Sequence, residues 1–408
     1  MSVLTKGEIT DEAIARVRGL ANQEMRVPYR FNLDVTRDGV RHLCWGIGDD
    51  NPLWLDADYA RGTDYGAPAA PPSYLYTIHP TFVQIGFAGV HGFHATTDWK
   101  LFRPLLIGAQ PSTTTWLSHV VEKEGRMGGR QVLVYFRTVY FDENDEVIAD
   151  CLTSSMRVMR DKARGKGKHR DWEQKHWTPE ELAPVEETQL RTAPRGAEPR
   201  YWEDVAVGQE LDALLKGPLG LTDMIAWYVG AHPLYGPAHE LAVKHYQHKP
   251  KFYYRNIDSG ALESGIRVHE DVAAARAAGV PAPYDLGVQR NQWLFHLLTN
   301  WVGDSGFVAE CNAEYRAFNF FGDIQELGGR ITGKRTDLAT GDHLVDLEVW
   351  SKNQRGENTM PGTAVVALPA RTGDRRPVTR RLAASLKRAD YLAEVVPDFI
   401  PLGDPRHS

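Results

Sequence analysis

The stretch that decides the fold is "LGVQRNQWLFHLLTNW", residues 286–301. Its large apolar side chains recur at the spacing i, i+3, i+4 and i+7, which places them on one face of a helix. These side chains are Leu294, Leu297, Leu298 and Trp301. Such a face needs an apolar surface to cover, so the stretch predicts a helix that lies on a β-sheet.

Candidate strands stand on both sides of this helix in the sequence. The segments "STTTWLSHVVEKE", "RQVLVYFRTVYF" and "EVIADCLTSSMRVMR" are β-branched, aromatic and partly alternating, and turn signals separate them. The segments "GRITGKRTD", "DHLVDLEVWSKN" and "TAVVALPAR" repeat this composition near the carboxyl end. The pattern predicts an α+β fold in which an antiparallel sheet wraps a helix, made twice.

Composition also suggests where the chain divides. Residues 161–200 are rich in charge, proline and glycine, which is typical of a linker, with one short helix expected at 179–190. We therefore expect a first half at 1–160, a second half at 201–372 and a tail at 373–408. Residues 228–262 form an insertion in the second half, and they serve either as a lid over a groove or as surface packing.

The overall composition excludes several classes of protein. The 408 residues carry a formal net charge of -6, which gives no electrostatic reason to expect nucleic acid as a partner. The three cysteines are far apart, as in a reduced cytoplasmic protein, and no apolar run is long enough for a signal peptide or a membrane span. We expect a cytoplasmic protein with no membrane partner. Three histidines in "HELAVKHYQH" lack zinc spacing, so no metal is expected.

The two halves can be aligned with each other. An offset of 215 residues places "LWLDADYAR" on "VHEDVAAAR", and after a slip of two residues "GAPA" meets "GVPA". Trp54 then corresponds to His269, and Asp56 corresponds to Asp271. The same offset places Asp49 on Ser264. We interpret the halves as one ancestral unit that was duplicated.

The segment "IGDDNPLWLD", residues 47–56, resembles the hydratase signature of the MaoC-like dehydratases, which include the (R)-specific enoyl-CoA hydratases. The segment "TDWKLFRPLLIGAQ" is similar to another part of the same domain, and the second half looks like the partner domain of two-domain acyl dehydratases. The resemblance implies a double hotdog with an acyl-CoA groove between its halves. It also implies reversible addition of water to a 2-enoyl-CoA, with no cofactor beyond the CoA of the substrate, by a homodimer.

The family uses an aspartate to activate water and a histidine to handle the proton at the α-carbon. The resemblance carries the aspartate role to Asp49, with Asn51 holding its loop, but Trp54 stands where the histidine belongs. The alignment gives the histidine role to His269 in the other half. The alternatives are a turn or helix cap for Asp49 and Asn51, and a surface position for His269.

If His269 works within its own half, its acid partner is Glu263, Asp258 or Asp285. Asp285 precedes the helix that Gly287 opens, where the family has a glycine whose N–H stabilises the thioester oxygen. A plain helix cap is the other interpretation of Asp285. Tyr284 and Trp54 complete the residues expected to bind substrate.

Because each half has kept one member of the pair, two rival functions stay open. One is a hotdog thioesterase, in which a carboxylate attacks or activates water at the thioester carbon. The other is a catalytically silent acyl-CoA-binding subunit that an active partner accompanies.

Overall fold

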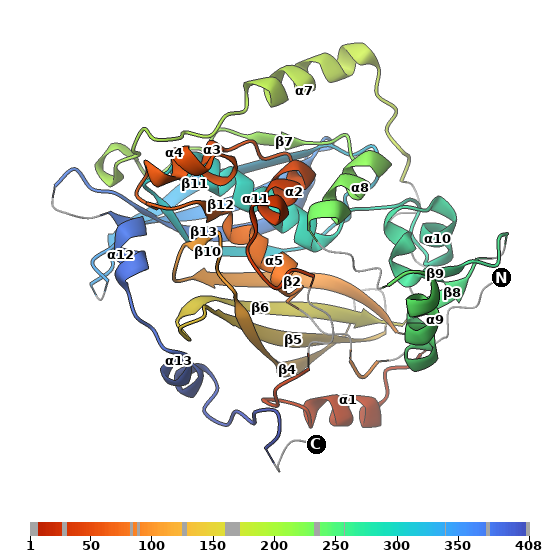
Figure 1. Cartoon of the computed structure of the whole chain (residues 1–408). Coiled ribbons are helices and arrows are strands. Elements are labelled where there is room, and N and C mark those ends of the chain that lie inside the picture. Colours follow the sequence, from red (N-terminus) through yellow and green to blue (C-terminus); the bar gives the residue numbers. More distant parts are fainter. Residues whose placement is uncertain are drawn as a thin grey trace.

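The computed structural model describes residues 7–26, 31–81, 85–87, 90–124, 129–159, 172–231, 237–256, 258–338, 340–372 and 376–404. In these ranges nine strands form one antiparallel sheet that runs through both halves (Figure 1). In sheet order they are β4 (Ser112–Glu124), β5 (Arg130–Phe141), β6 (Val147–Val158), β2 (His91–Leu101), β10 (Phe307–Glu314), β13 (Asn358–Leu368), β12 (His343–Asn353), β11 (Gln325–Thr336) and β7 (Leu214–Lys216).

The strand order repeats from one half to the other. In each half the first long strand lies beside the last one, so β2 neighbours β6 and β10 neighbours β13. The two halves meet where β2 pairs with β10, with Trp99 opposite Cys311. This arrangement confirms the predicted double hotdog, and all six predicted strand segments overlap observed strands.

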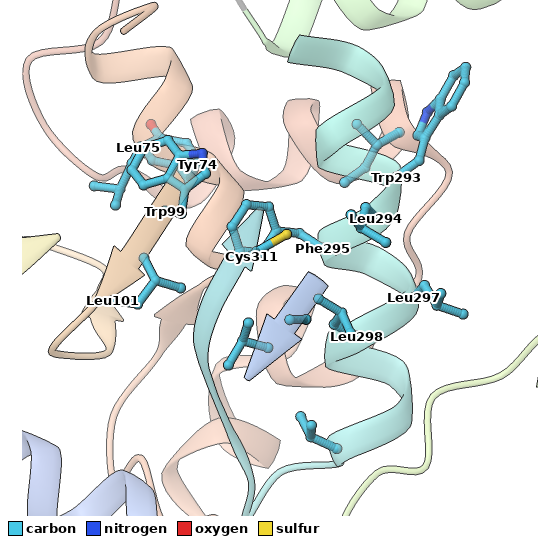
Figure 2. Close-up of a cluster of buried hydrophobic side chains, with 14 of the residues drawn as sticks. Tyr74, Leu75, Trp99, Leu101, Trp293, Leu294, Phe295, Leu297, Leu298 and Cys311 are labelled. Carbon is cyan, nitrogen blue, oxygen red and sulfur yellow. The ribbon is translucent and has the colours of Figure 1, made fainter. Parts of the chain in front are cut away.

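The predicted central helix is α11 (Gly287–Val302), and it is buried along almost its whole length. Figure 2 shows Phe295 and Leu298 of α11 on the side of Cys311 in β10, with Trp99 of β2 nearby. The Trp99 and Phe295 rings meet edge to face with 6.3 Å between their centroids. The helix therefore covers the junction of the two halves rather than one sheet alone.

The corresponding helix of the first half is much shorter than expected. The 3-10 turn η1 (Pro72–Tyr74) and α5 (Leu75–Ile78) replace it. The reason is local, because Pro80 excludes helical geometry at the preceding residue, and His79 is indeed extended. Only the second half therefore has a long central helix.

The structure supports the alignment of the two halves in residues 52–61 and 265–277. The helices α3 (Pro52–Leu55) and α4 (Ala57–Arg61) correspond to η4 (Gly265–His269) and α10 (Val272–Ala277). Asp56 caps α4 by accepting from Asp58 and Tyr59, and Asp271 caps α10 by accepting from Ala274. Trp54 and His269 thus stand at equivalent places, each two residues before a capping aspartate.

A close crossing joins α2 (Arg37–Ile47) to α8 (Leu221–Gly230) above the sheet (Figure 1). A Cβ on Gly46 would lie 2.8 Å from the carbonyl oxygen of Ala226, and one on Gly230 would lie 2.2 Å from that of His42. Each helix therefore needs a glycine where the backbone of the other crosses it.

The linker, the insertion and the tail all contain ordered elements. Residues 161–171 of the linker lie outside the described residues, and the predicted short helix is α7 (Pro179–Arg191), whose first turn is a capping box. The insertion contains α9 (His239–His248), η3 (Pro250–Phe252), β8 (Tyr253–Arg255) and β9 (Leu262–Ser264); residues 232–236 and 257 lie outside the description. The remaining elements are α1 (Asp11–Arg18), β1 (Ala69–Ala70), β3 (Leu105–Leu106), η2 (Trp202–Asp204), α12 (Pro377–Ala383) and α13 (Arg388–Val395).

The tail, which sequence patterns left unexplained, returns to the first half. The hydroxyl of Tyr391 in α13 donates to the buried carboxylate of Asp150 at 2.6 Å, and Phe399 packs edge to face against Trp116. The tail therefore covers an apolar cluster on β4, β5 and β6. Among the described helices, none combines the length and the apolar character that a membrane crossing requires.

The α2–α8 crossing generates a stability prediction. Replacing Gly230 by Ala places a methyl group against the backbone of α2, so the helices must separate, and we expect the free energy of unfolding in urea to fall by about 1–3 kcal/mol. Gly19→Ala is the matched control, because its Cβ would meet nothing closer than 3.5 Å. Equal unfolding free energies for both variants would contradict the close crossing.

Candidate active site

Asp49 and Asn51 form a buried turn where α2 ends. Gly48 closes α2 in the left-handed region at φ 68°, and the chain then turns toward the core. Asp49 Oδ1 accepts from the N–H of Asn51 at 3.0 Å, and Asn51 Oδ1 caps α3 by accepting from the N–H of Leu53 at 3.0 Å. These bonds are the turn and cap contacts expected from the residue types. Only one oxygen of Asp49 is used by the turn.

The side chain that meets Asp49 is His296, which projects from the middle of α11. Its Nε2 lies 3.6 Å from Asp49 Oδ1, and both side chains are only 1% exposed. Among the described residues, neither His296 Nε2 nor Asp49 Oδ2 forms a hydrogen bond of normal geometry, and the Trp54 side chain is close enough to help lower the pKa of Asp49. Buried polar atoms without partners are rare in folded proteins. A carboxylate of the first half and an imidazole of the second half therefore face each other across the seam.

Lys216 of β7 supports this pair from the second half. Its Nζ lies 3.0 Å from His296 Nδ1 and donates to the carbonyl oxygen of Ile47 at 2.7 Å. Because an ammonium group can only donate, Nδ1 accepts and the ring carries its proton on Nε2. The proton of His296 is thus on the side of Asp49.

Burial decides the protonation of all three groups. Desolvation raises the pKa of Asp49 to about 6, although the Asn51 N–H and the Lys216 ammonium pull it down. Desolvation lowers the pKa of Lys216 to about 8 against the attraction of Asp49. It also lowers the pKa of His296 well below its usual range. Near neutral pH the aspartate is charged, the lysine is charged and the histidine is neutral.

His269 lies in a different environment from Asp49. Its Nδ1 is 2.9 Å from the carbonyl oxygen of Tyr284, and the two rings meet edge to face at 4.5 Å. Desolvation lowers the pKa of His269 to about 4. Among the described residues, no hydrogen bond or ion pair joins His269 to Asp49.

The acid partners considered for His269 are engaged elsewhere or exposed. Arg290 donates through Nε and Nη2 to both oxygens of Asp285, at 2.8 and 2.5 Å. Glu263 forms an ion pair with Arg267 at 2.7 Å. Asp258 lies in an exposed turn. The structure thus brings none of these three carboxylates to His269 as a hydrogen-bonded partner, and only the backbone of Asp285 contacts the ring.

Gly287 does open α11, and the structure gives a steric reason for a glycine there. A Cβ at this position would lie 2.6 Å from Nδ1 of His94, whose ring packs against the first turn of the helix. His296 follows nine residues later, which is about 13 Å along a helix. Gly287 and His296 therefore cannot both contact one atom of a thioester. The oxyanion role expected for Gly287 is not tested by the structure and stays a prediction.

Trp54 lies between two hollows beside the Asp49 turn. The inner hollow is lined by apolar side chains with Thr299 of α11, and its enclosed space of about 20 Å³ holds no more than one or two waters. The outer hollow, of about 320 Å³, includes Arg37 and Arg41. Leu53 and Trp54 line both hollows. The tryptophan thus fills the position of the missing histidine and separates the two spaces.

Sequence reasoning missed His296 and Lys216. The signal was present in α11, where Gln289, Gln292 and His296 recur at i, i+3 and i+7 and so share one face of the helix. A buried helix has no need of such a polar stripe unless other groups meet it. Lys216, in a three-residue strand at the sheet edge, had no comparable signal.

Comparison with known proteins bears on the fold and on the first half. Residues 27–151 match the family model described as the FAS1-like dehydratase domain region. A UPF0336 protein of Streptomyces griseus is 24% identical over 127 residues, which are 29% of this chain and 81% of that protein.

Two solved structures resemble the whole chain. A MaoC-like dehydratase superposes with a TM-score of 0.59 at 18% identity, covering 86% of this chain and 100% of its own. A MaoC domain protein from Chloroflexus aurantiacus gives 0.52 at 13% identity, covering 86% and 95%. At these identities the likeness establishes the fold. The resemblance drawn from the sequence is thus confirmed: the chain has the double hotdog fold of the MaoC-like dehydratases, and residues 27–151 are similar to the FAS1-like dehydratase region.

Proposed function

We propose that the protein adds water reversibly to a 2-enoyl thioester of CoA, with Asp49 and His296 as the acid–base pair. The observation that carries the proposal is the approach of Asp49 to His296, two buried groups that each keep one polar atom without a hydrogen-bond partner among the described residues. The pair restores, from two halves of the chain, the carboxylate and imidazole that hydration needs.

The protonation states suit this chemistry. The charged Asp49 accepts a proton from water while the water oxygen bonds to C3 of the substrate. Nε2 of His296 gives its proton to C2, and Nδ1 takes a proton from Lys216. The proton on Asp49 then passes to Nε2 of His296 while Nδ1 returns its proton to Lys216, which restores the starting state. Dehydration follows the same steps in reverse.

The two hollows give the substrate its expected orientation. Arg37 and Arg41, which line the outer hollow together with Asp38 and Asp56, are the groups expected to contact the phosphates of CoA. The inner hollow has the apolar lining that an acyl chain needs but, at about 20 Å³, no room for one, because Trp54 closes it off from the outer hollow. The thioester then lies beside the turn that carries Asp49.

Removing either member of the pair should abolish hydration. In Asp49→Asn or His296→Gln we expect kcat/KM for crotonyl-CoA to fall by about 10²- to 10⁴-fold, measured as loss of the enoyl absorbance. The matched controls are Asp58→Asn and His119→Gln, two exposed residues that should leave turnover unchanged.

Full turnover in either Asp49→Asn or His296→Gln would remove this pair from the mechanism. Release of free thiol without loss of the enoyl absorbance would indicate a thioesterase instead. Binding of CoA thioesters with neither reaction would indicate a silent subunit.

The shifted pKa values predict a bell-shaped pH profile. Activity should rise as pH passes about 6, because Asp49 must be ionised to accept a proton, and fall above about 8, because Lys216 must be charged to donate. In Lys216→Met the upper limb should disappear. The lower limb should move to higher pH, because the cation that lowers the pKa of Asp49 is gone. An unchanged profile in Lys216→Met would exclude Lys216 from positioning His296.

Trp54 should set the acyl chain length. Replacing it by Ala opens the wall between the hollows, so the ratio of kcat/KM for 2-octenoyl-CoA to that for crotonyl-CoA should rise about tenfold or more. Trp54→Phe keeps most of the wall and is the matched control. The same ratio in Trp54→Ala and in the unaltered protein would show that the acyl chain lies elsewhere.

A further inference from the structure

Arg157, near the end of β6, is a buried cation that no described residue pairs as a counter-ion. It is 4% exposed, and in the described part of the chain its Nε and Nη2 have no hydrogen-bond partner. In the sheet it pairs with Val132 of β5 and Gly92 of β2, so its side chain lies on the same face as Val132. That face packs against α1 through a cluster of buried apolar residues. The guanidinium is therefore set on a largely apolar surface.

Other arginines of this chain show what the same edge of the guanidinium normally does. In Arg137, Arg290 and Arg371 the Nε and Nη2 groups bind one carboxylate, those of Asp150, Asp285 and Asp204 respectively. This planar pair of donors matches two oxygens of a carboxylate or phosphate. In Arg157 no described carboxylate occupies that edge.

A glycine on the neighbouring strand makes room for the guanidinium of Arg157. A Cβ on Gly92 would lie 2.4 Å from Nη1 of Arg157 and 3.3 Å from Oγ of Ser155. Gly92 does not have the positive φ that would require a glycine for backbone reasons, so the close approach of the guanidinium is the reason for its missing side chain. Gly92 is itself exposed, which places Nη1 of Arg157 near the protein surface.

We infer that Arg157, with Ser155 beside Gly92, forms a binding site for the oxyanion of a small molecule, a carboxylate or a phosphate. A buried charge without a partner costs several kcal/mol, and a bidentate oxyanion supplies both the missing charge and the two missing acceptors. The Ser155 hydroxyl, which also lies beside Gly92, adds a third donor.

The charge of Arg157 persists under ordinary conditions. Burial lowers its pKa to about 10, so the group stays protonated near neutral pH. Arg157 therefore does not become neutral by losing its proton near neutral pH. This site is independent of the proposed hydratase activity, because its test measures binding and stability.

The experiment compares the full chain with Arg157→Met in a zwitterionic buffer free of phosphate and carboxylates. Inorganic phosphate, glutarate and CoA are added separately, and binding is followed by calorimetry and by the midpoint of thermal unfolding. We expect at least one probe to raise the midpoint of the unaltered protein with concentration, and to bind Arg157→Met at least about tenfold more weakly. The probe that shows this difference identifies the source of the oxyanion.

Two further variants sharpen the test. Gly92→Ala keeps the arginine but fills the space beside Nη1, so it should weaken binding in the same way. Arg330→Met removes a surface arginine paired with Glu348 and should bind as the unaltered protein does. Equal binding of all three probes by the unaltered protein and Arg157→Met would overturn the inference. If Arg157→Met does not fold, undiminished binding by Gly92→Ala overturns it.

Discussion

The burial of α11 on all sides is the constraint on which the rest of the structure depends. The β2–β10 pairing joins two sheets into one, and the first half then covers the side of α11 that the second half leaves open. Polar side chains on such a helix must find partners in either half. Asn291 accepts from the Tyr76 hydroxyl at 2.7 Å, and Gln292 accepts from Trp227 Nε1 at 2.6 Å.

His296 belongs to the same set of polar side chains, but its contacts are incomplete. Lys216 satisfies one ring nitrogen, while the other faces Asp49 at a distance too long for a hydrogen bond. The candidate site is thus one place where the described residues do not close the seam between the halves with hydrogen bonds, and Gln289 of α11 marks another. Asp49 and His296 come from different halves, so small changes in helix packing alter the distance between them directly. The crossing of α2 with α8 at Gly46 and Gly230 lies close to the turn that carries Asp49.

The chain treats its buried arginines in two ways. Arg290 is bound by Asp285 and by the carbonyl oxygen of Ala317, so its charge and its donors are matched within the protein. Nε and Nη2 of Arg157 have no such partner among the described residues, and the sheet position opposite Arg157 is a glycine. Arg290 therefore contributes to the fold, whereas Arg157 is the arginine for which we propose a ligand. An unpaired buried charge is costly, and a bound oxyanion would remove that cost.

Local patterns in the sequence determined the fold class, the strands, the long helix and the equivalence of Asp56 with Asp271, because helix period, strand alternation and capping are properties of neighbouring residues. The early end of the first-half helix also has a local cause, Pro80, although we expected a longer helix there. Only the tertiary structure decided that Asp49 meets His296 while His269 binds the Tyr284 carbonyl. Such meetings depend on strand register and helix crossing between distant segments, and a shift of one residue along α11 turns a side chain about 100° away.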